Sequence, residues 1–267
     1  MPDPAAHEQT IGAYRLDEQL SVDSAGVVYR AYHTPTGQPV VIRVLPPDRV
    51  AAPGFRERFE REMRAVASLY HPHIIELYEF NIIEGRAFIV SELPSGGLLH
   101  EVVQKHSLPL RLSVELARQM AVALGAAHAR GVVHGALKPE SIAVFPEPGG
   151  GYLLKVGDFG IARLIAPTAA NPAAYRAPEL RAGSEPDPRT DCYALGTLLY
   201  EMIVGSPPPL TAIPPLRLVR SDAPAELETL VARCLASAPA DRFEMHELVE
   251  ALKALVAAMG ERISAVA

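Results

Sequence analysis

The sequence has no tryptophan and only two cysteines, Cys192 and Cys234, among its 267 residues. Two cysteines exclude a disulfide scaffold and a zinc site built on cysteine ligands. Both lie in helical patterns, so we expect them to be small buried apolar side chains in a protein of the reducing cytoplasm.

Positive charge and long apolar runs are also scarce. The chain has 25 Lys and Arg against 31 Asp and Glu, a net charge of −6, which argues against nucleic acids and anionic membranes as partners. The most apolar stretch, residues 194–205, contains Glu201 and is shorter than the roughly 20 residues that a membrane-spanning helix needs. We therefore expect no nucleic-acid partner and no membrane span in this chain.

Strand patterns dominate the first 93 residues, and 49% of the whole sequence is apolar, as in globular proteins. Four short runs rich in β-branched and aromatic residues predict strands at 26–32, 40–45, 74–80 and 87–93. Between the second and third runs, apolar residues recur at steps of three and four from Phe55 to Leu69 and predict an amphipathic helix.

Helical patterns dominate after Pro94-Ser95-Gly96-Gly97. They predict helices at 111–130, 190–204, 225–235 and 244–259, with short strand-like pieces at 132–133 and 153–156. We expect an α+β fold with two lobes, a small antiparallel β lobe with one helix and a larger, mainly helical lobe. The expected boundaries are a tail at 1–10, lobes at 11–93 and 94–260, and a tail at 261–267. A cleft between two lobes is a natural ligand site.

Three motifs follow one another in the second half of the chain. They are His134-Gly135-Ala136-Leu137-Lys138-Pro139-Glu140-Ser141, Gly157-Asp158-Phe159-Gly160 and Tyr175-Arg176-Ala177-Pro178-Glu179. Their order and spacing match the catalytic loop, the metal-binding DFG motif and the APE motif of protein kinases. From about residue 11 to residue 258, the chain resembles a bacterial eukaryotic-like Ser/Thr protein kinase domain, and the resemblance implies the two-lobed protein-kinase-like fold.

The resemblance also implies a nucleotide site, with Asp158 as a metal ligand. The nucleotide-binding positions that it assigns are Gly26, Val28, Val41, Arg43, Glu62, Glu92, Lys138 and Asp158. The Gly-rich loop falls on Ser21, Asp23 and Gly26 and keeps only its last glycine, while the family's strand lysine is Arg43. Asp23 adds a negative charge that would face the nucleotide phosphates. At about 4 Å, this repulsion costs roughly 1–4 kcal/mol of binding free energy.

The catalytic positions depart further from the family pattern. Ala136 stands where the family has the aspartate that accepts the hydroxyl proton, Ser141 replaces the asparagine that holds a second Mg²⁺, and Gly135 replaces the loop arginine. Loss of a positioned general base costs about 10²–10⁴ in rate. In the activation segment, the family's threonine falls on Pro172, and Thr168 remains as a lone threonine. With Ala136, Ser141 and Arg43 all altered, we expect no intact catalytic residue.

The structural anchors of the family are present. The resemblance implies that Asp191 holds the backbone of the catalytic loop and that Glu179 pairs with Arg242 beneath the activation segment. A retained framework around altered catalytic positions favours a domain that folds as the family does without the family's chemistry.

Our leading hypothesis is a pseudokinase, a regulatory or scaffolding domain that binds protein partners and has weak or no affinity for ATP and Mg²⁺. Its docking surface would be the helix at 55–69, the activation segment or the Pro-rich loop at 206–215. One alternative is a divergent, low-activity ATP-dependent Ser/Thr protein kinase, or another phosphoryl or nucleotidyl transferase, that uses Asp158, Lys138 and Arg43. A second alternative is a nucleotide sensor that binds ATP without hydrolysing it.

Overall fold

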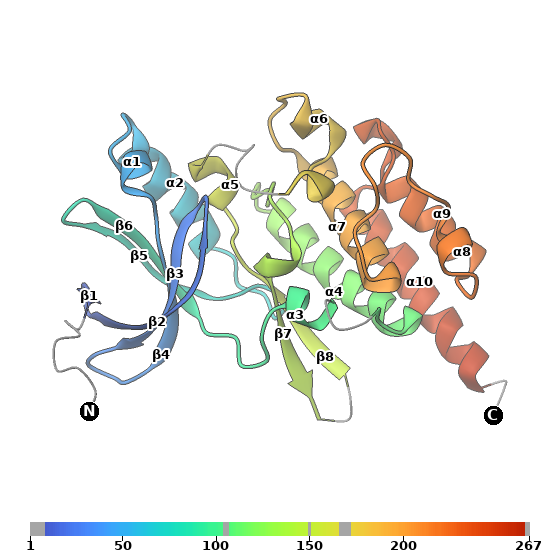
Figure 1. Ribbon diagram of the computed structural model, residues 1–267, viewed down its shortest axis with the longest axis horizontal. Helices are drawn as coiled ribbons and strands as arrows, with labels where there is room; N and C mark the ends of the chain where they lie inside the picture. The colour runs from blue at the N-terminus through green and yellow to red at the C-terminus, as the bar shows by residue number, and fades with distance from the viewer. Residues whose placement is uncertain (1–8, 104–106, 149–150, 166–171, 265–267) are drawn as a thin grey trace. The chain divides into compact units, whose positions relative to one another are not determined.

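The computed structural model describes residues 9–103, 107–148, 151–165 and 172–264, and side chains up to residue 260. Its contacts divide the chain into two units, residues 1–68 with 76–93 and residues 69–75 with 94–267. The first is mostly strands and the second mostly helices (Figure 1). The α+β class with one β-rich and one helical part is confirmed.

The first unit is built on a six-stranded antiparallel sheet with the strand order β1-β2-β3-β4-β6-β5. The strands are β1 (Thr10–Ile11), β2 (Tyr14–Asp23), β3 (Gly26–His33), β4 (Pro39–Val44), β5 (Leu77–Ile83) and β6 (Arg86–Glu92). Tight turns join β2 to β3 and β5 to β6, so the register of neighbouring strands is set locally.

Two helices accompany this sheet, α1 (Pro47–Val50) and α2 (Phe55–Ala67). Phe55, Phe59 and Met63 lie on one face of α2 and are almost fully buried. The ring of Phe59 meets Phe80 of β5 edge-on, with 5.9 Å between ring centroids. The predicted amphipathic helix is confirmed, because its apolar residues cover strand β5 while its charged residues, apart from the buried Glu62, are exposed or half-buried.

The second unit contains eight helices in the part of the chain that is described. They are α3 (Leu99–Val103), α4 (Leu110–His128), α5 (Ile161–Leu164), α6 (Pro178–Arg181), α7 (Pro188–Val204), α8 (Leu216–Val219), α9 (Ala225–Cys234) and α10 (Met245–Ser264). Helix α7 is buried along most of its length, and α4 packs against α7, α10 and the hairpin of β7 (Ile142–Glu147) and β8 (Gly151–Val156). Cys192 on α7 and Cys234 on α9 are buried free thiols, as expected.

One strand prediction was wrong in part and another was wrong. The strand expected at 74–80 begins at Leu77, because Ile74 forms a bridge to Val156 and the Ile75 N–H donates to the carbonyl of Val156. These bonds also place residues 69–75 with the second unit, although the sequence suggested the first lobe. The piece expected at 132–133 is not a strand.

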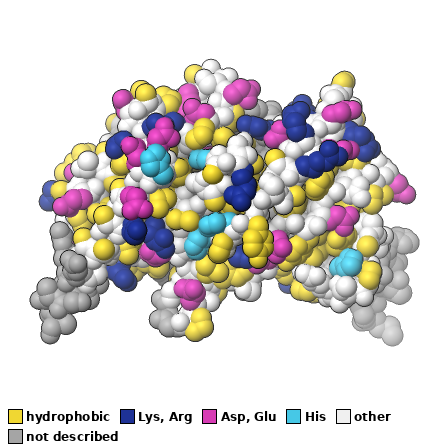
Figure 2. Space-filling model, turned by 180° about the vertical axis from the view of Figure 1, so that it is seen from behind, with side chains coloured by type: hydrophobic (Ala, Val, Ile, Leu, Met, Phe, Trp, Pro, Cys, Tyr) yellow, Lys and Arg dark blue, Asp and Glu magenta, His cyan; other side chains and the backbone are white. Residues whose placement is uncertain are grey.

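Basic and acidic side chains lie interspersed on the face of the molecule that Figure 2 shows. None of the helices in the described ranges is long and apolar enough to span a membrane.

Candidate functional site

The backbone of residues 134–135 is held by one buried carboxylate. Asp191, near the start of α7, accepts hydrogen bonds from the N–H groups of His134 at 2.9 Å and Gly135 at 2.8 Å. It also lies 2.7 Å from Nε2 of His128. A carboxylate that receives several donors in a buried place fixes the loop that donates them, so the role expected of Asp191 is confirmed.

His134 is fully buried, and burial lowers its pKa although the charges of Asp191 and Asp158 act in the opposite direction. Its Nε2 lies 2.9 Å from the carbonyl oxygen of Gly157, and Nδ1 accepts the N–H of Ala136 at 3.3 Å. One nitrogen donates and the other accepts, which is the pattern of a neutral ring. The ring also packs against Phe159, with 4.9 Å between centroids.

Ala136 and Ser141 occupy the positions where the resemblance places the proton acceptor and a metal ligand. Ala136 is buried, and its methyl side chain has no lone pair. The Ser141 hydroxyl donates to the carbonyl of Lys138 at 2.8 Å and accepts the Lys138 N–H at 3.1 Å. This closes a 3₁₀ turn at Pro139–Ser141. The hydroxyl proton and one lone pair are therefore used within the loop, which leaves one lone pair for a ligand.

Asp158 adopts a left-handed backbone with φ of 58°. Gly160 follows with φ of 78° and begins helix α5. Aspartate tolerates this region better than most residues do. The left-handed backbone at Asp158 and Gly160 therefore sets the direction of the Asp158 side chain. Its role as a metal ligand, like the phosphate-facing role of Lys138, stays a prediction.

In the first unit, the one glycine that survives in the Gly-rich loop is required by packing. Gly26 has φ of +117°, and a Cβ there would lie 2.0 Å from the carbonyl oxygen of Val44 on β4. No side chain fits at that distance, so the tip of the β2–β3 hairpin lies directly on β4. The glycine is explained by this contact without reference to a phosphate.

The cation of strand β4 is engaged by the same hairpin. Nη1 of Arg43 lies 3.0 Å from Oδ1 of Asp23, and the same oxygen accepts the N–H of Ala25 at 2.8 Å. The Arg43 side chain is 11% exposed and that of Asp23 is 28% exposed. The sequence indicated that Asp23 would repel phosphate but not that it pairs with Arg43.

The other predicted nucleotide-binding positions of this unit lie on the same sheet or on α2. Val28 on β3 stands opposite Arg43, and Val41 lies two residues before Arg43 on β4. Glu92 ends β6, opposite Val40. Glu62 is buried on α2, where its Oε1 accepts hydrogen bonds from Arg61. The predicted pairing of Glu62 with Arg43 stays a prediction.

The segment around the third motif is anchored as the resemblance implies. The guanidinium of Arg242, which has no exposed side-chain surface, donates to both carboxylate oxygens of Glu179 at 2.6 and 2.7 Å. Partial burial acts to raise the pKa of Glu179, but the hydrogen bonds and charge of Arg242 lower it below its ordinary value. Nearby, the Tyr175 hydroxyl donates to Glu201 at 2.7 Å. Thr168 lies outside the described residues.

These donor sets fit a two-metal nucleotide site poorly. Mg²⁺ favours carboxylates with near-octahedral geometry, and the second unit offers Asp158 and a serine hydroxyl already bonded to Lys138. No group of three or more His, Cys, Asp or Glu in the described ranges could hold a metal ion. The first unit offers an arginine that already bonds a carboxylate.

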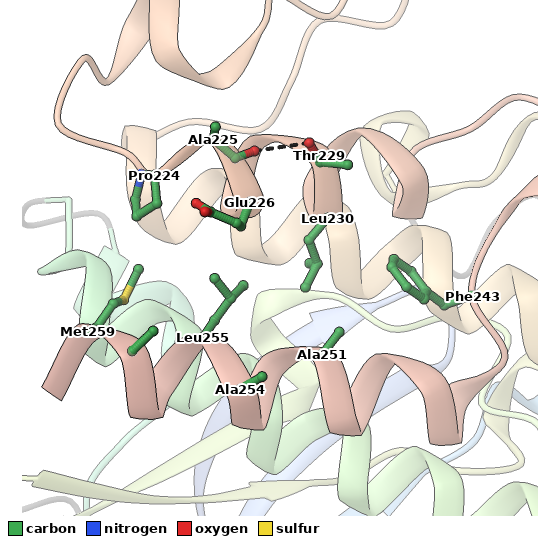
Figure 3. A pocket seen from close by; sticks show the side chains of 11 residues that line it. Pro224, Ala225, Glu226, Thr229, Leu230, Phe243, Ala251, Ala254, Leu255 and Met259 are labelled. Carbon is green, nitrogen blue, oxygen red and sulfur yellow. Dashed lines mark hydrogen bonds between the residues drawn. The ribbon is translucent and has the colours of Figure 1, made fainter. Parts of the chain in front are cut away.

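An apolar groove of about 560 Å³ lies between α9 and α10 (Figure 3). Leu230, Phe243, Leu255 and Met259 contribute its apolar lining, and Glu226 is the single carboxylate in the lining. The groove is built from sequence beyond the three motifs.

Known proteins resemble this chain over most of its length. The protein kinase domain family matches residues 14–252. The chain is 32% identical to the serine/threonine-protein kinase PknI of Mycobacterium tuberculosis, over 88% of this chain and 40% of PknI. It is also 32% identical to Pkn1 of Myxococcus xanthus, over 87% of this chain and 36% of Pkn1. The chain thus spans two fifths or less of the length of these curated relatives.

A solved structure shares the fold as well. The crystal structure of the PknI kinase domain from Mycobacterium tuberculosis matches with a TM-score of 0.76 and 31% sequence identity. The match covers 93% of this chain and 98% of that domain. The antiparallel sheet with its helix and the helical lobe are therefore the two parts of the protein-kinase fold.

Proposed function

Because the chain belongs to the protein kinase family, we propose that it is a pseudokinase, a regulatory or scaffolding domain that transfers no phosphate. Ala136 carries the proposal, because it stands where the resemblance places the residue that accepts the proton of the attacking hydroxyl. A methyl group cannot accept a proton. The loss of a positioned base alone lowers the rate by about 10²–10⁴.

The groups that would hold a nucleotide support the same proposal. Phosphoryl transfer depends mostly on positioning and on charge that stabilises the transferred group. In this chain the Ser141 hydroxyl is bonded within its own loop, and Arg43 is bonded to Asp23. Both nucleotide affinity and chemistry are then weakened, and weak binding of ATP and Mg²⁺ is expected.

An active, divergent Ser/Thr protein kinase is the second candidate, and the comparisons favour it. The matched relatives PknI and Pkn1 are named serine/threonine-protein kinases. Asp158, Lys138 and Arg43 also keep a charge of the sign that the family uses at each position. An enzyme that positions ATP without a base retains part of the rate that positioning provides.

For a pseudokinase, the function would be carried out by binding proteins. The segment from the Pro-rich loop through α8 exposes four large apolar side chains, Leu210, Ile213, Leu218 and Val219. Large apolar side chains that stay exposed within one short stretch of chain are a feature of protein–protein contact sites. This supports the region around 206–219 as a docking surface better than the charged outer face of α2.

Transfer of labelled phosphate from ATP and Mg²⁺ to a generic Ser/Thr acceptor protein tests the proposal. The native chain should label the acceptor no faster than the variant Asp158→Ala. Labelling by the native chain that Asp158→Ala abolishes would overturn the pseudokinase proposal and support the second candidate. The variant Ala136→Asp should also stay inactive, because the nucleotide-holding groups are altered as well. Recovery by that single change would contradict this second part.

A further inference from the structure

One carboxylate oxygen of Asp23, in the β2–β3 hairpin, accepts two hydrogen bonds. Oδ1 of Asp23 accepts Nη1 of Arg43 from strand β4 and the backbone N–H of Ala25 from the turn. The first bond is 3.0 Å long and the second 2.8 Å. A guanidinium and a backbone amide that converge on one oxygen form an anion-binding arrangement.

The same two kinds of donor bind phosphate oxygens in proteins. Guanidinium groups match phosphate and carboxylate geometry equally, and backbone N–H groups of turns form concave anion sites. Asp23 supplies a carboxylate where the resemblance places a glycine of the phosphate loop, and Arg43 stands at the family's phosphate-pairing cation. The carboxylate therefore makes the bonds that a phosphate oxygen would otherwise make.

The hairpin is held in the position that makes these bonds. Gly26 pairs with Asp23 across the turn and lies directly on the carbonyl of Val44. Val28, two residues further along β3, is opposite Arg43 in the β3–β4 register. Because the Arg43 side chain is 11% exposed, water screens its attraction to Asp23 less than at an open surface.

We propose that Asp23 is an intramolecular substitute for a nucleotide phosphate, which occupies the anion-binding donors of Arg43 and Ala25 and lowers the affinity of the chain for polyphosphates. The inference rests on the proposed function, because it names the cause of weak nucleotide binding. An incoming phosphate must displace the carboxylate from Arg43 or bind beside its negative charge. Both routes weaken binding.

The test is the dissociation constant for ATP with Mg²⁺ and for inorganic triphosphate, measured by titration calorimetry. Asp23→Asn keeps the shape and an oxygen for the Ala25 N–H but removes the charge, and it should tighten binding of both ligands about tenfold or more. Asp23→Ala should also tighten binding of both ligands. It provides the test if Asp23→Asn does not fold. In the Asp23→Asn background, Arg43→Met should remove the gain.

Asp17→Asn is the matched control. Asp17 lies on the same strand, and its Oδ2 is 3.3 Å from Nε of Arg30 with a similar exposure of 35%. It should leave both dissociation constants unchanged. Equal gains from Asp17→Asn and Asp23→Asn, no gain from either Asp23 variant, or no measurable binding to either Asp23 variant at millimolar ligand would each overturn the proposal. Phosphate transfer by the native chain would overturn the proposed function and would leave these affinities as the test of Asp23.

Discussion

At the scale of single residues, Gly135 packs too closely against Pro186 for a side chain to fit at this position of the loop. Gly135 has φ of +70°, and a Cβ there would lie 2.9 Å from Cβ of Pro186. A side chain at this position would be strained twice, by its backbone and by its neighbour. The arginine that the family has here could not be restored without moving Pro186.

Gly135→Ala should therefore lower the free energy of unfolding more than Gly37→Ala does. Gly37 has nearly the same φ, +71°, but nothing lies within 4 Å of its added Cβ, so it reports the backbone cost of roughly 1–2 kcal/mol alone. The Pro186 contact should add roughly 1–3 kcal/mol for Gly135→Ala. Urea unfolding of both variants measures the difference, and equal losses would contradict the contact.

His134 should stay neutral at a pH where free histidine is charged. Burial lowers its pKa below the ordinary value of 6.5. As pH falls below 6.5, His134 is protonated in the unfolded chain but stays neutral in the folded one. The free energy of unfolding therefore decreases, by up to about 1.4 kcal/mol per pH unit. Above 6.5 His134 has no effect, because the ring is neutral in both states.

The ring itself is the better readout of this prediction, since burial raises the pKa of Glu201 and shifts stability in the opposite direction. Nitrogen chemical shifts in NMR should show a neutral His134 with the proton on Nε2 at pH 6. A charged ring at that pH would mean that the hydrogen bonds to Gly157 and Ala136 are wrongly assigned.

Side-chain contacts were predicted correctly from the sequence where both contacting residues belong to motifs of the family. The contacts of Asp191 with the loop and of Arg242 with Glu179 follow from the family pattern. The Asp23–Arg43 pair does not, because it depends on the register of the β2–β3 hairpin against β4 and on side-chain conformation. Opposite charges at the hairpin tip and on β4 were the available signal.

At the scale of elements, the long helices and the strands expected at 26–32, 40–45, 87–93 and 153–156 were predicted well. The errors concern β5, β7 and the piece at 132–133. Helices α4, α7, α9 and α10 lie where the apolar repeats placed them, within a few residues. Strand β7 (Ile142–Glu147) was missed, because its apolar run directly follows the catalytic-loop motif and ends in Pro146. Strand β5 begins later than predicted, since the Ile75 N–H and the His73 carbonyl bond to Val156, and these residues do not pair with β6.

The close approach of α7 and α9 gives a prediction at this scale. An added Cβ on Gly196 of α7 would lie 2.5 Å from Cβ of Cys234 on α9, whereas one on Gly125 of α4 would lie 3.6 Å from Cγ of Met245. Both changes to alanine gain helix propensity of about 1 kcal/mol. Gly196→Ala should nevertheless be less stable than Gly125→Ala by roughly 1–3 kcal/mol, because it overpacks the contact between helices. Equal stability in thermal unfolding would show that α7 and α9 lie further apart.

At the scale of the whole molecule, the chain has the protein-kinase fold and departs from the family pattern at positions where the resemblance places groups that act on phosphate. The sheet and the helical lobe match a kinase domain, and Arg242 pairs with Glu179 as the resemblance implies. Ala136 has no proton acceptor, Ser141 bonds its own loop, and Arg43 bonds Asp23. Because fold stability depends on the first set and the proposed loss of chemistry on the second, the fold and the loss of activity can be tested separately.

The formation of ADP from ATP and Mg²⁺, in the presence of a mixed library of Ser- and Thr-containing peptides, tests the absence of phosphotransfer most directly. This readout detects transfer to any acceptor in the library. We expect the native chain to form ADP at the rate of the Asp158→Ala variant and of buffer alone. Peptide-dependent ADP formation by the native chain, lost in Asp158→Ala, would contradict it and establish an active kinase.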